Sequence, residues 1–311
     1  MEEGRLKSDE IWDCIILGAG PAGLSALTYL VRFHRSALAL GGAGPKPRCS
    51  LIDRTYNLPG YPDGVTGVNL LKRLRDQAEE FGGEVWSQTA EDVSGNNGDF
   101  HVELSDGQTL RARKIILAMG VRDRAPSLEA LREHEGHFLR YCPVCDGYEH
   151  TGRQLGIIGS GGSVARHALF LKTFSNDISI FLDGRDANFG RYEKILRDKE
   201  ISYHQPRIVD VMIDDDPAAE YRGAGVCLED GSAHPLGVLY SNLGCDLHFE
   251  PVRGLNLKLD EDKYILTDIN QETSVPGIYA AGDVTSQINQ ISVAFGQAAI
   301  AAVRVHNSLD D

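Results

Sequence analysis

Short apolar runs alternate with helix-like patterns along most of the chain. Residues 15–17 are continuously apolar, and apolar positions then recur at helical spacing over residues 24–31. Residues 155–158 and 164–171 repeat this order later in the chain. A buried strand followed directly by an amphipathic helix is typical of α/β folds with a parallel sheet. The pattern therefore predicts two α/β segments of similar plan.

In both segments, the predicted strand and helix are followed by a hairpin signal and a further apolar strand. The Asp-Gly pairs at 106–107 and 230–231 stand between alternating segments, as expected for tight hairpins. Apolar strands are then predicted over residues 114–119 and 236–240. We interpret this order as one dinucleotide-binding fold used twice.

The C-terminal region does not continue the second copy. Residues 274–284 predict a buried strand, and a helix rich in alanine is expected from about Gln290. Small side chains would allow this helix to pack closely. We expect both elements to complete the first domain rather than the second.

These assignments imply a discontinuous first domain, with the second domain inserted into it. We predict the first domain as residues 1–122 and 251–311, and the inserted domain as residues 123–250. The Asp- and Pro-rich stretch 213–220 is expected to form an exposed turn of the inserted domain.

Composition and charge exclude several classes of function. The 311 residues are 42% hydrophobic and 24% charged, an ordinary balance for a globular chain. With 31 basic and 45 acidic residues the net charge is −14, which repels phosphate backbones, so we expect no nucleic-acid partner. No run approaches the roughly 18 apolar residues of a membrane helix, and the N-terminus, MEEGRLKSDE, lacks the apolar core of a signal peptide. We expect a cytoplasmic protein without a membrane anchor.

The turns after the two early strands are rich in glycine. Gly18, Gly20 and Gly23 form G-x-G-x-x-G between a strand and a helix, which is the context of a dinucleotide site. The first glycine makes the tight turn, the second admits a pyrophosphate, and the third allows close helix–strand packing. The corresponding residues of the second loop are Gly159, Gly161, Gly162 and Ser163.

Cys142 and Cys145 form a C-P-V-C pair that Asp146 follows directly. Half of a zinc site would need two more ligands, and no second C-x-x-C exists, although three histidines are nearby. A purely structural pair would be unusual at this spacing. Two thiols so placed can close a reversible disulfide, and the adjacent carboxyl group can move the proton that exchange requires. The spacing favours a redox dithiol, and no metal site is assigned.

Four features in this order resemble the low-molecular-weight thioredoxin reductase family over essentially the whole chain. They are GAGPAG at 18–23, C-P-V-C-D-G at 142–147, the second glycine loop, and G-I-Y-A-A-G-D-V at 277–284. The resemblance implies an α/β protein with two Rossmann-like dinucleotide-binding domains, the second inserted into the first. It also implies a homodimer, FAD in the discontinuous domain, a redox-active disulfide in the inserted one, and thioredoxin or a similar disulfide protein as partner.

The resemblance further assigns roles to individual residues. It implies that Cys145 faces the flavin, that Cys142 attacks the partner's disulfide, and that Asp146 is the acid–base residue. The residues that match FAD contacts of the family are Gly18, Gly20, Pro21, Ala22, Gly23, Asn57, Gly282, Asp283, Gln290 and Ile291.

The second dinucleotide site departs from the family pattern. Members that use NADPH carry a basic His-Arg-Arg cluster that holds the 2′-phosphate. In this chain Asp183 and Gly184 take the first two positions, only Arg185 remains, and Arg191 is out of step. A carboxylate at this place would repel a 2′-phosphate, but it can accept hydrogen bonds from the ribose hydroxyls of NADH or of a second FAD.

We therefore predict a flavoprotein disulfide oxidoreductase of the thioredoxin reductase type. Electrons would pass through FAD and the Cys142–Cys145 disulfide to a protein disulfide such as that of thioredoxin. We expect ferredoxin or a second flavin, rather than NADPH, to supply them. Three alternatives stay open: an NAD(P)H-dependent thioredoxin reductase, a dithiol oxidase acting on small molecules, and a non-enzymatic flavin redox sensor.

Overall fold

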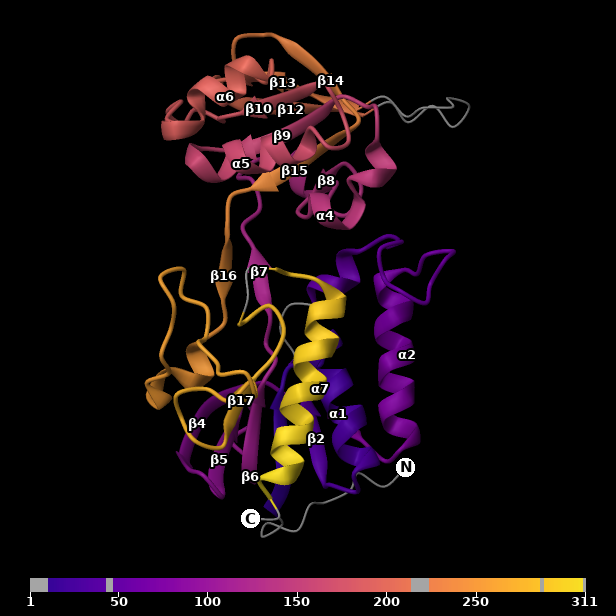
Figure 1. Ribbon diagram of the computed structural model, residues 1–311, viewed down its shortest axis with the longest axis vertical. Helices are drawn as coiled ribbons and strands as arrows, with labels where there is room; N and C mark the ends of the chain where they lie inside the picture. Colours follow the sequence, from indigo (N-terminus) through magenta and orange to yellow (C-terminus); the bar gives the residue numbers. More distant parts are fainter. Residues whose placement is uncertain (1–10, 43–46, 214–223, 286–287, 310–311) are drawn as a thin grey trace. The chain divides into compact units, whose positions relative to one another are not determined.

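The computed structural model describes residues 11–42, 47–213, 224–285 and 288–309 of the chain, and residues 214–220 of the predicted exposed turn lie outside these ranges. The structure contains two compact units (Figure 1). Unit 1 comprises residues 1–54, 58–122 and 247–311, and unit 2 comprises residues 55–57 and 123–246. Each unit has its own parallel sheet and hydrophobic core, so the predicted fold class, α/β with two Rossmann-like units, is confirmed.

Unit 1 is built on a seven-stranded sheet with the order β3-β2-β1-β6-β5-β4, in which β17 also pairs with β6. The strands β1, β2, β3, β6 and β17 run parallel, whereas β4, β5 and β6 form an antiparallel edge. The strands are β1 (Ile11–Leu17), β2 (Ala37–Leu40), β3 (Glu84–Trp86), β4 (Ala90–Asn96), β5 (Asp99–Leu104), β6 (Thr109–Leu117) and β17 (Ile278–Ala280).

Three helices lie together on one face of the unit 1 sheet (Figure 1). They are α1 (Pro21–Arg32), α2 (Gly67–Glu80) and α7 (Ile291–Asn307), and the short helices η1 (Arg48–Leu51) and η4 (Glu250–Leu255) complete the unit. Small side chains let α1 and α7 approach closely, since Ala26, Ala298 and Ala301 are fully buried between them and the sheet. The predicted alanine-rich helix is confirmed, with Gln290 as its N-cap.

Unit 2 contains a five-stranded parallel sheet with the order β11-β10-β9-β15-β8 and a three-stranded antiparallel sheet, β12-β13-β14. The strands are β8 (Leu139–Arg140), β9 (Leu155–Gly159), β10 (Ile178–Phe181), β11 (Ser202–His204), β12 (Ile208–Ile213), β13 (Ala224–Leu228), β14 (Ala233–Leu236) and β15 (Val238–Asn242). The helices are α3 (Glu129–Arg132), α4 (Pro143–Asp146), η2 (Tyr148–His150), α5 (Gly161–Leu171), η3 (Gly190–Tyr192) and α6 (Glu193–Asp198).

Both predicted hairpins are confirmed, but some predicted strands have different bounds. The run 236–240 is divided at Gly237, because Leu236 pairs with β13 whereas Val238 pairs with β9. The chain therefore changes sheets within one apolar run, which hydrophobicity alone does not show. The buried run 274–284 forms a strand only over the three residues that pair with β6.

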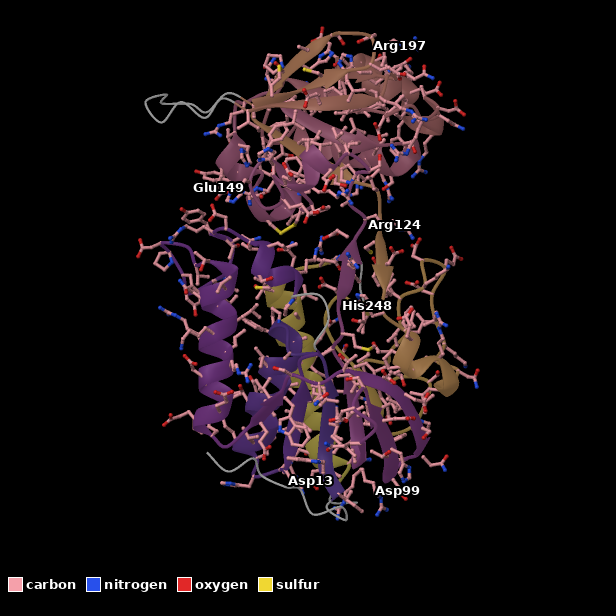
Figure 2. The ribbon with its side chains drawn as sticks, turned by 180° about the vertical axis from the view of Figure 1, so that it is seen from behind. Asp13, Asp99, Arg124, Glu149, Arg197 and His248 are labelled. Carbon is pink, nitrogen blue, oxygen red and sulfur yellow. A yellow bond between two sulfur atoms is a disulfide. The ribbon has the colours of Figure 1, made fainter. Side chains whose placement is uncertain are left out.

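Two short strands, β7 (Val121–Asp123) and β16 (Cys245–Leu247), pair where the chain passes between the units. Beside them Arg124 Nη2 lies 2.6 Å from Asp246 Oδ1. Charged side chains such as Asp99 and Arg197 lie on the outer surfaces of their units (Figure 2). Within the described ranges, no helix is both long and apolar enough to cross a membrane.

Candidate active site

The first glycine loop joins β1 to α1 in unit 1. Gly18 has φ = +115°, and a Cβ on it would lie 2.2 Å from the Ala118 carbonyl oxygen. A Cβ on Gly23 would lie 1.8 Å from the Gly18 carbonyl oxygen. Gly20 differs, because among the described residues the nearest atom to a Cβ there is Pro47 Cβ at 4.0 Å. The protein itself thus requires glycine at two positions, and at Gly20 it leaves room for a ligand to approach the backbone.

The N-terminus of α1 fits the pyrophosphate of a dinucleotide. Pro21 occupies the first turn, where its missing N–H is not needed, and no side chain of the described residues caps the helix. The amide groups of this turn therefore remain for an anion. Ala22 is buried, and its Cβ lies 3.0 Å from the position of a Cβ on Gly282. The C-terminal Gly-Asp pair is thus close to the glycine loop, as an FAD site of this kind requires.

Asp283 is largely buried beside Arg48. Its Oδ2 lies 3.4 Å from Arg48 Nη1, and burial raises the pKa of this carboxyl group while the guanidinium opposes that change. The Gly282 N–H donates to Gln297 Oε1 at 2.8 Å, which ties the segment to α7. The sequence pattern identified Asp283 but missed Arg48, because an arginine at the start of the short helix η1 belongs to no motif.

Gln290 and Ile291 stand at the start of α7, in the same unit as the glycine loop. Ile291 packs with Phe295 against a small apolar cluster around Cys49 and Leu58. The position of this helix end is therefore fixed by packing. Contact of the two residues with the flavin edge stays a prediction.

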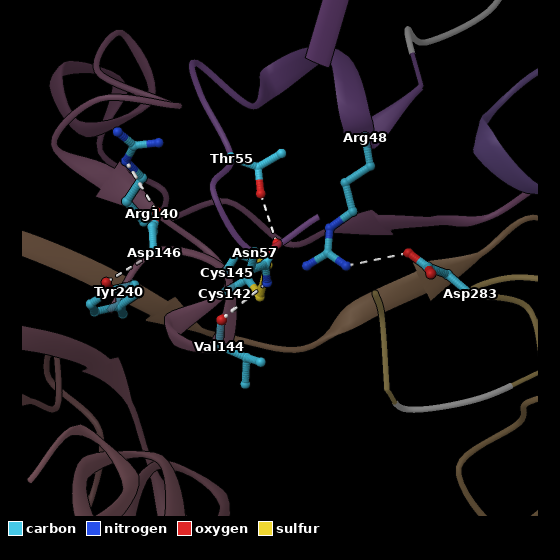
Figure 3. Close-up of a disulfide and its surroundings, with 10 residues drawn as sticks. All are labelled: Arg48, Thr55, Asn57, Arg140, Cys142, Val144, Cys145, Asp146, Tyr240 and Asp283. Carbon is cyan, nitrogen blue, oxygen red and sulfur yellow. Dashed lines mark hydrogen bonds and ion pairs between the residues drawn. A yellow bond between two sulfur atoms is a disulfide. The ribbon is translucent and has the colours of Figure 1, made fainter. Parts of the chain in front are cut away.

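Cys142 and Cys145 form a disulfide in unit 2 (Figure 3). Cys142 is the N-cap of α4, and the Cys145 N–H donates to the Cys142 carbonyl oxygen at 3.0 Å. This is the pairing that the redox interpretation requires. Across the described ranges, no group of three or more His, Cys, Asp or Glu side chains is arranged to hold a metal ion.

Asn57 lies beside this turn and belongs to unit 2 (Figure 3). Its Nδ2 donates to the carbonyl oxygen of Val144, the residue that precedes Cys145, at 3.3 Å. Its Oδ1 accepts from Thr55 Oγ1 at 2.7 Å. The structure thus brings one predicted flavin-contacting residue to the backbone between the two cysteines, and its contact with the flavin stays a prediction.

Asp146 is held by two side chains from neighbouring strands (Figure 3). Tyr240 Oη donates to Asp146 Oδ1 at 2.8 Å, and Arg140 Nε lies 3.6 Å from Asp146 Oδ2. Burial raises the pKa of this carboxyl group, while Arg140 and the hydrogen bond from Tyr240 lower it. A buried carboxyl group with opposing influences on its pKa is suited to giving and taking protons. The sequence pattern predicted Asp146 and missed both of its partners.

His150 is a buried neighbour of this group whose Nδ1 has no hydrogen-bond partner within the described residues. Its ring lies edge-on to Tyr240, with centroids 6.4 Å apart. Burial, together with the nearby charges of Arg140 and Arg153, lowers the pKa of His150 from 6.5 to about 4. The folded protein therefore holds this histidine neutral at pH values where the unfolded chain protonates it.

We expect the free energy of unfolding to fall between pH 6.5 and about 4 partly because of His150. Only the unfolded state binds the proton in this window, so the contribution is complete above it and is lost as the pH falls through it. His150→Gln should reduce the loss between pH 7 and pH 4 by about 3 kcal/mol, measured by urea unfolding. His34→Gln, at an exposed site, is the control and should leave the loss unchanged. Equal pH dependence of wild type and His150→Gln would contradict the assignment.

The second glycine loop joins β9 to α5 in unit 2. A Cβ on Gly159 would lie 2.7 Å from the Asn242 carbonyl oxygen, so the close approach of β15 requires glycine there. A Cβ on Gly162 would lie 3.4 Å from the Tyr192 ring. Gly159 therefore repeats the close approach of a neighbouring strand segment that Gly18 shows in the first loop.

Gly161 and Ser163 lie in the first turn of α5, which no side chain in the described part of the chain caps. The Ser163 carbonyl oxygen lies 2.9 Å from His167 Nδ1 one turn later. The four predicted residues of the second loop are thus gathered at the N-terminus of α5, as the glycines of the first loop are gathered at the N-terminus of α1. Binding of a nucleotide there stays a prediction.

Asp183 stands two residues after β10, where φ is +52°. Its Oδ1 accepts from the Ile208 N–H at 3.1 Å, and its Oδ2 lies 3.3 Å from Arg185 Nη1. Arg185 also donates to the Leu182 carbonyl oxygen at 3.2 Å. The carboxylate therefore fixes the start of β12 and holds the one arginine of the expected basic cluster against the turn.

Arg207 is a second cation at this turn that the sequence pattern missed. A Cβ on Gly184 would lie 2.9 Å from Arg207 Cγ, so the arginine side chain passes directly over the glycine. It comes from the segment between β11 and β12, which the altered basic cluster does not include. The turn thus combines one carboxylate with two guanidinium groups rather than three cations.

Two Rossmann-like units, one bearing a C-x-x-C disulfide, are typical of disulfide oxidoreductases that bind a flavin dinucleotide. The family model for pyridine nucleotide-disulphide oxidoreductases matches residues 12–298. The chain belongs to this family, and it is an FAD-dependent oxidoreductase that resembles the low-molecular-weight thioredoxin reductases over nearly its full length.

Individual relatives agree with this placement. The thioredoxin reductase of Rickettsia felis is 29% identical over 307 residues, which cover 95% of this chain and 97% of the relative. The crystal structure of thioredoxin reductase from Streptococcus pyogenes is 25% identical, covers 96% of this chain and 98% of its own, and gives a TM-score of 0.83. The crystal structure of HlmI is 26% identical, covers 97% and 94%, and gives a TM-score of 0.88.

Proposed function

We propose that this protein passes electrons through FAD and the Cys142–Cys145 disulfide to a protein disulfide such as that of thioredoxin. The observation that carries the proposal is the disulfide directly followed by a buried carboxyl group with two partners. The likeness to thioredoxin reductases over nearly the whole chain supports thioredoxin as the acceptor.

The same likeness supports a homodimer in the cytoplasm. Size-exclusion chromatography with light scattering would test the dimer, and cell fractionation would test the location.

The α1 glycine loop and Asp283 would hold FAD, which in its reduced form would supply the two electrons that open the disulfide. In the reduced dithiol, the Cys142 thiolate attacks the partner's disulfide and displaces one partner sulfur. Cys145 then attacks the mixed disulfide, which re-forms the Cys142–Cys145 bond and releases the second partner sulfur. Asp146 takes the proton from one attacking thiol and returns it to a departing thiolate. The partner gains two electrons and two protons, and the disulfide is restored.

The acceptor can be tested without knowing the donor. Anaerobic protein reduced chemically with dithionite and freed from excess reductant should convert oxidised thioredoxin to its dithiol, counted by a maleimide gel shift. Failure to transfer electrons to thioredoxin, with FAD bound and the cysteines reduced, would contradict the proposed acceptor.

We propose further that the donor is ferredoxin or a second flavin rather than NADPH. The support is the Asp183 carboxylate at the place where a 2′-phosphate would be held, with Arg185 already directed toward it. A fixed negative charge there opposes the binding of a phosphate dianion, whereas an uncharged ribose hydroxyl can donate a hydrogen bond to the carboxylate.

NADPH is therefore expected to bleach the flavin slowly in an anaerobic titration, and reduced ferredoxin is expected to bleach it faster. Asp183→Asn keeps an acceptor for the Ile208 N–H and removes the charge, so the rate ratio of NADPH to NADH should rise by up to about tenfold. Asp186→Asn, an exposed site three residues later, is the matched control for the loss of one charge. Rapid stoichiometric bleaching of the wild type by NADPH would contradict the donor proposal.

A further inference from the structure

The two partners of Asp146 are fixed by the sheet of unit 2. Tyr240 and Arg140 are aligned partners across the parallel strands β15 and β8, and Tyr240 is also aligned with Ile157 of β9. β15 lies between these strands, so the tyrosine ring projects from the interior of the sheet. The register that pairs the strands therefore also sets where the phenol and the guanidinium meet the carboxyl group.

The phenol of Tyr240 is unusual for its position. The side chain is only 1% exposed and packs within the apolar core of unit 2. A phenylalanine would fill the same volume without bringing a polar group into that core. The hydroxyl is accommodated because it donates to Asp146 at 2.8 Å. The buried polar group thus serves the residue that follows the disulfide.

We propose that Tyr240 is a positioning residue for the disulfide chemistry, holding the Asp146 carboxyl group in place together with Arg140 and setting when it carries its proton. This inference rests on the proposed function, in which Asp146 moves a proton during thiol–disulfide exchange. In that exchange the reduced Cys142–Cys145 dithiol gives two electrons to the partner's disulfide and becomes a disulfide itself. Its two protons end on the two partner sulfurs, one of them by way of the carboxyl group. With dithiothreitol as the electron donor, the same exchange runs in reverse.

The direction of the effect follows from the surrounding charges. Arg140 and the hydrogen bond from Tyr240 lower the pKa of Asp146, whereas burial and the nearby charge of Glu149 raise it. His150, packed against Tyr240, has a lowered pKa and is neutral near pH 7. Removing the phenol hydroxyl therefore removes one of the influences that lower the pKa of Asp146. The pKa rises, and the carboxyl group keeps its proton to higher pH.

The test is the pH dependence of a half-reaction that needs neither the natural donor nor the acceptor. FAD-loaded protein is mixed anaerobically with excess dithiothreitol, and bleaching of the flavin is followed by stopped flow. The bleaching rate plotted against pH contains limbs, which are ranges over which the rate changes with pH. The limb due to Asp146 is the one that Asp146→Asn removes. Tyr240→Phe should move this limb upward by about one pH unit. Tyr279→Phe, another buried strand tyrosine, is the matched control and should leave it in place.

Two further variants make the inference specific. Arg140→Gln removes the other lowering influence, so it should move the limb in the same direction even if Tyr240→Phe folds poorly. In the Asp146→Asn background, Tyr240→Phe should have no further effect on the profile. A limb that stays in place in folded Tyr240→Phe and in Arg140→Gln, or an effect that persists without Asp146, would overturn the inference alone. A wild type that dithiothreitol cannot bleach would overturn the proposed function and this inference with it.

Discussion

Cys145→Ser is expected to abolish electron transfer to a disulfide partner while leaving FAD bound. A serine hydroxyl cannot form the disulfide with Cys142, so the oxidised state of the centre no longer exists. The rate of thioredoxin reduction by chemically reduced protein should fall by more than about 10³-fold. FAD content should be unchanged, because the cysteine lies in unit 2 and the first glycine loop in unit 1. Both are measured on the same preparation, by stopped flow and by flavin released on denaturation.

Cys227→Ser is the matched control, since Cys227 is a half-buried free cysteine in the same unit. It should reduce thioredoxin at the wild-type rate. The two active-site cysteines are expected to differ in one respect, because only Cys145→Ser leaves Cys142 free to form a mixed disulfide with the partner. That adduct is visible on a non-reducing gel. Wild-type turnover in both Cys142→Ser and Cys145→Ser would show that this disulfide is not the active centre.

The sequence predicted the elements of the fold best where a single local pattern decides the structure. The apolar run 15–17 predicted β1, and the apolar positions at helical spacing after the glycine loop predicted α1. The Asp-Gly pairs predicted both hairpins. It predicted less well where the partner strand decides. The change from β14 to β15 at Gly237 depends on which sheet each residue joins, and hydrophobicity is the same on both sides.

The candidate site shows the same contrast between residues that a local pattern predicts and residues that only tertiary contacts bring together. Cys142, Cys145 and Asp146 are adjacent in the chain, so their chemistry could be read from spacing alone. Tyr240 is 94 residues from Asp146, and the two meet because β15 pairs with β8, the strand that leads into α4. The Arg48–Asp283 pair spans 235 residues and likewise leaves no local signal. Residues that position a site were missed because their role depends on tertiary contacts.

The FAD site allows a sharper test, because two of its glycines are constrained by different neighbours. A Cβ on Gly23 would lie 1.8 Å from a backbone oxygen of the protein, whereas a Cβ on Gly20 meets, within the described part of the chain, only Pro47 Cβ at 4.0 Å. Gly20 also has φ = −82° and ψ = −170°, which alanine adopts without strain. Alanine should therefore be tolerated by the fold at Gly20 and not at Gly23.

Gly20→Ala is accordingly expected to leave the melting temperature of the FAD-free protein unchanged and to raise the Kd for FAD by about 10- to 100-fold. The added methyl group would occupy the space through which the pyrophosphate reaches the α1 amides, and overpacking of this size costs about 1–3 kcal/mol. Gly23→Ala should lower both the melting temperature and the FAD affinity. Gly296→Ala, within α7 and with no described atom within 4 Å of its Cβ, is the control for FAD affinity, and it should raise the melting temperature slightly because alanine is the better helix former. Wild-type FAD affinity in folded Gly20→Ala, measured by titrating the FAD-free protein, would place the pyrophosphate elsewhere.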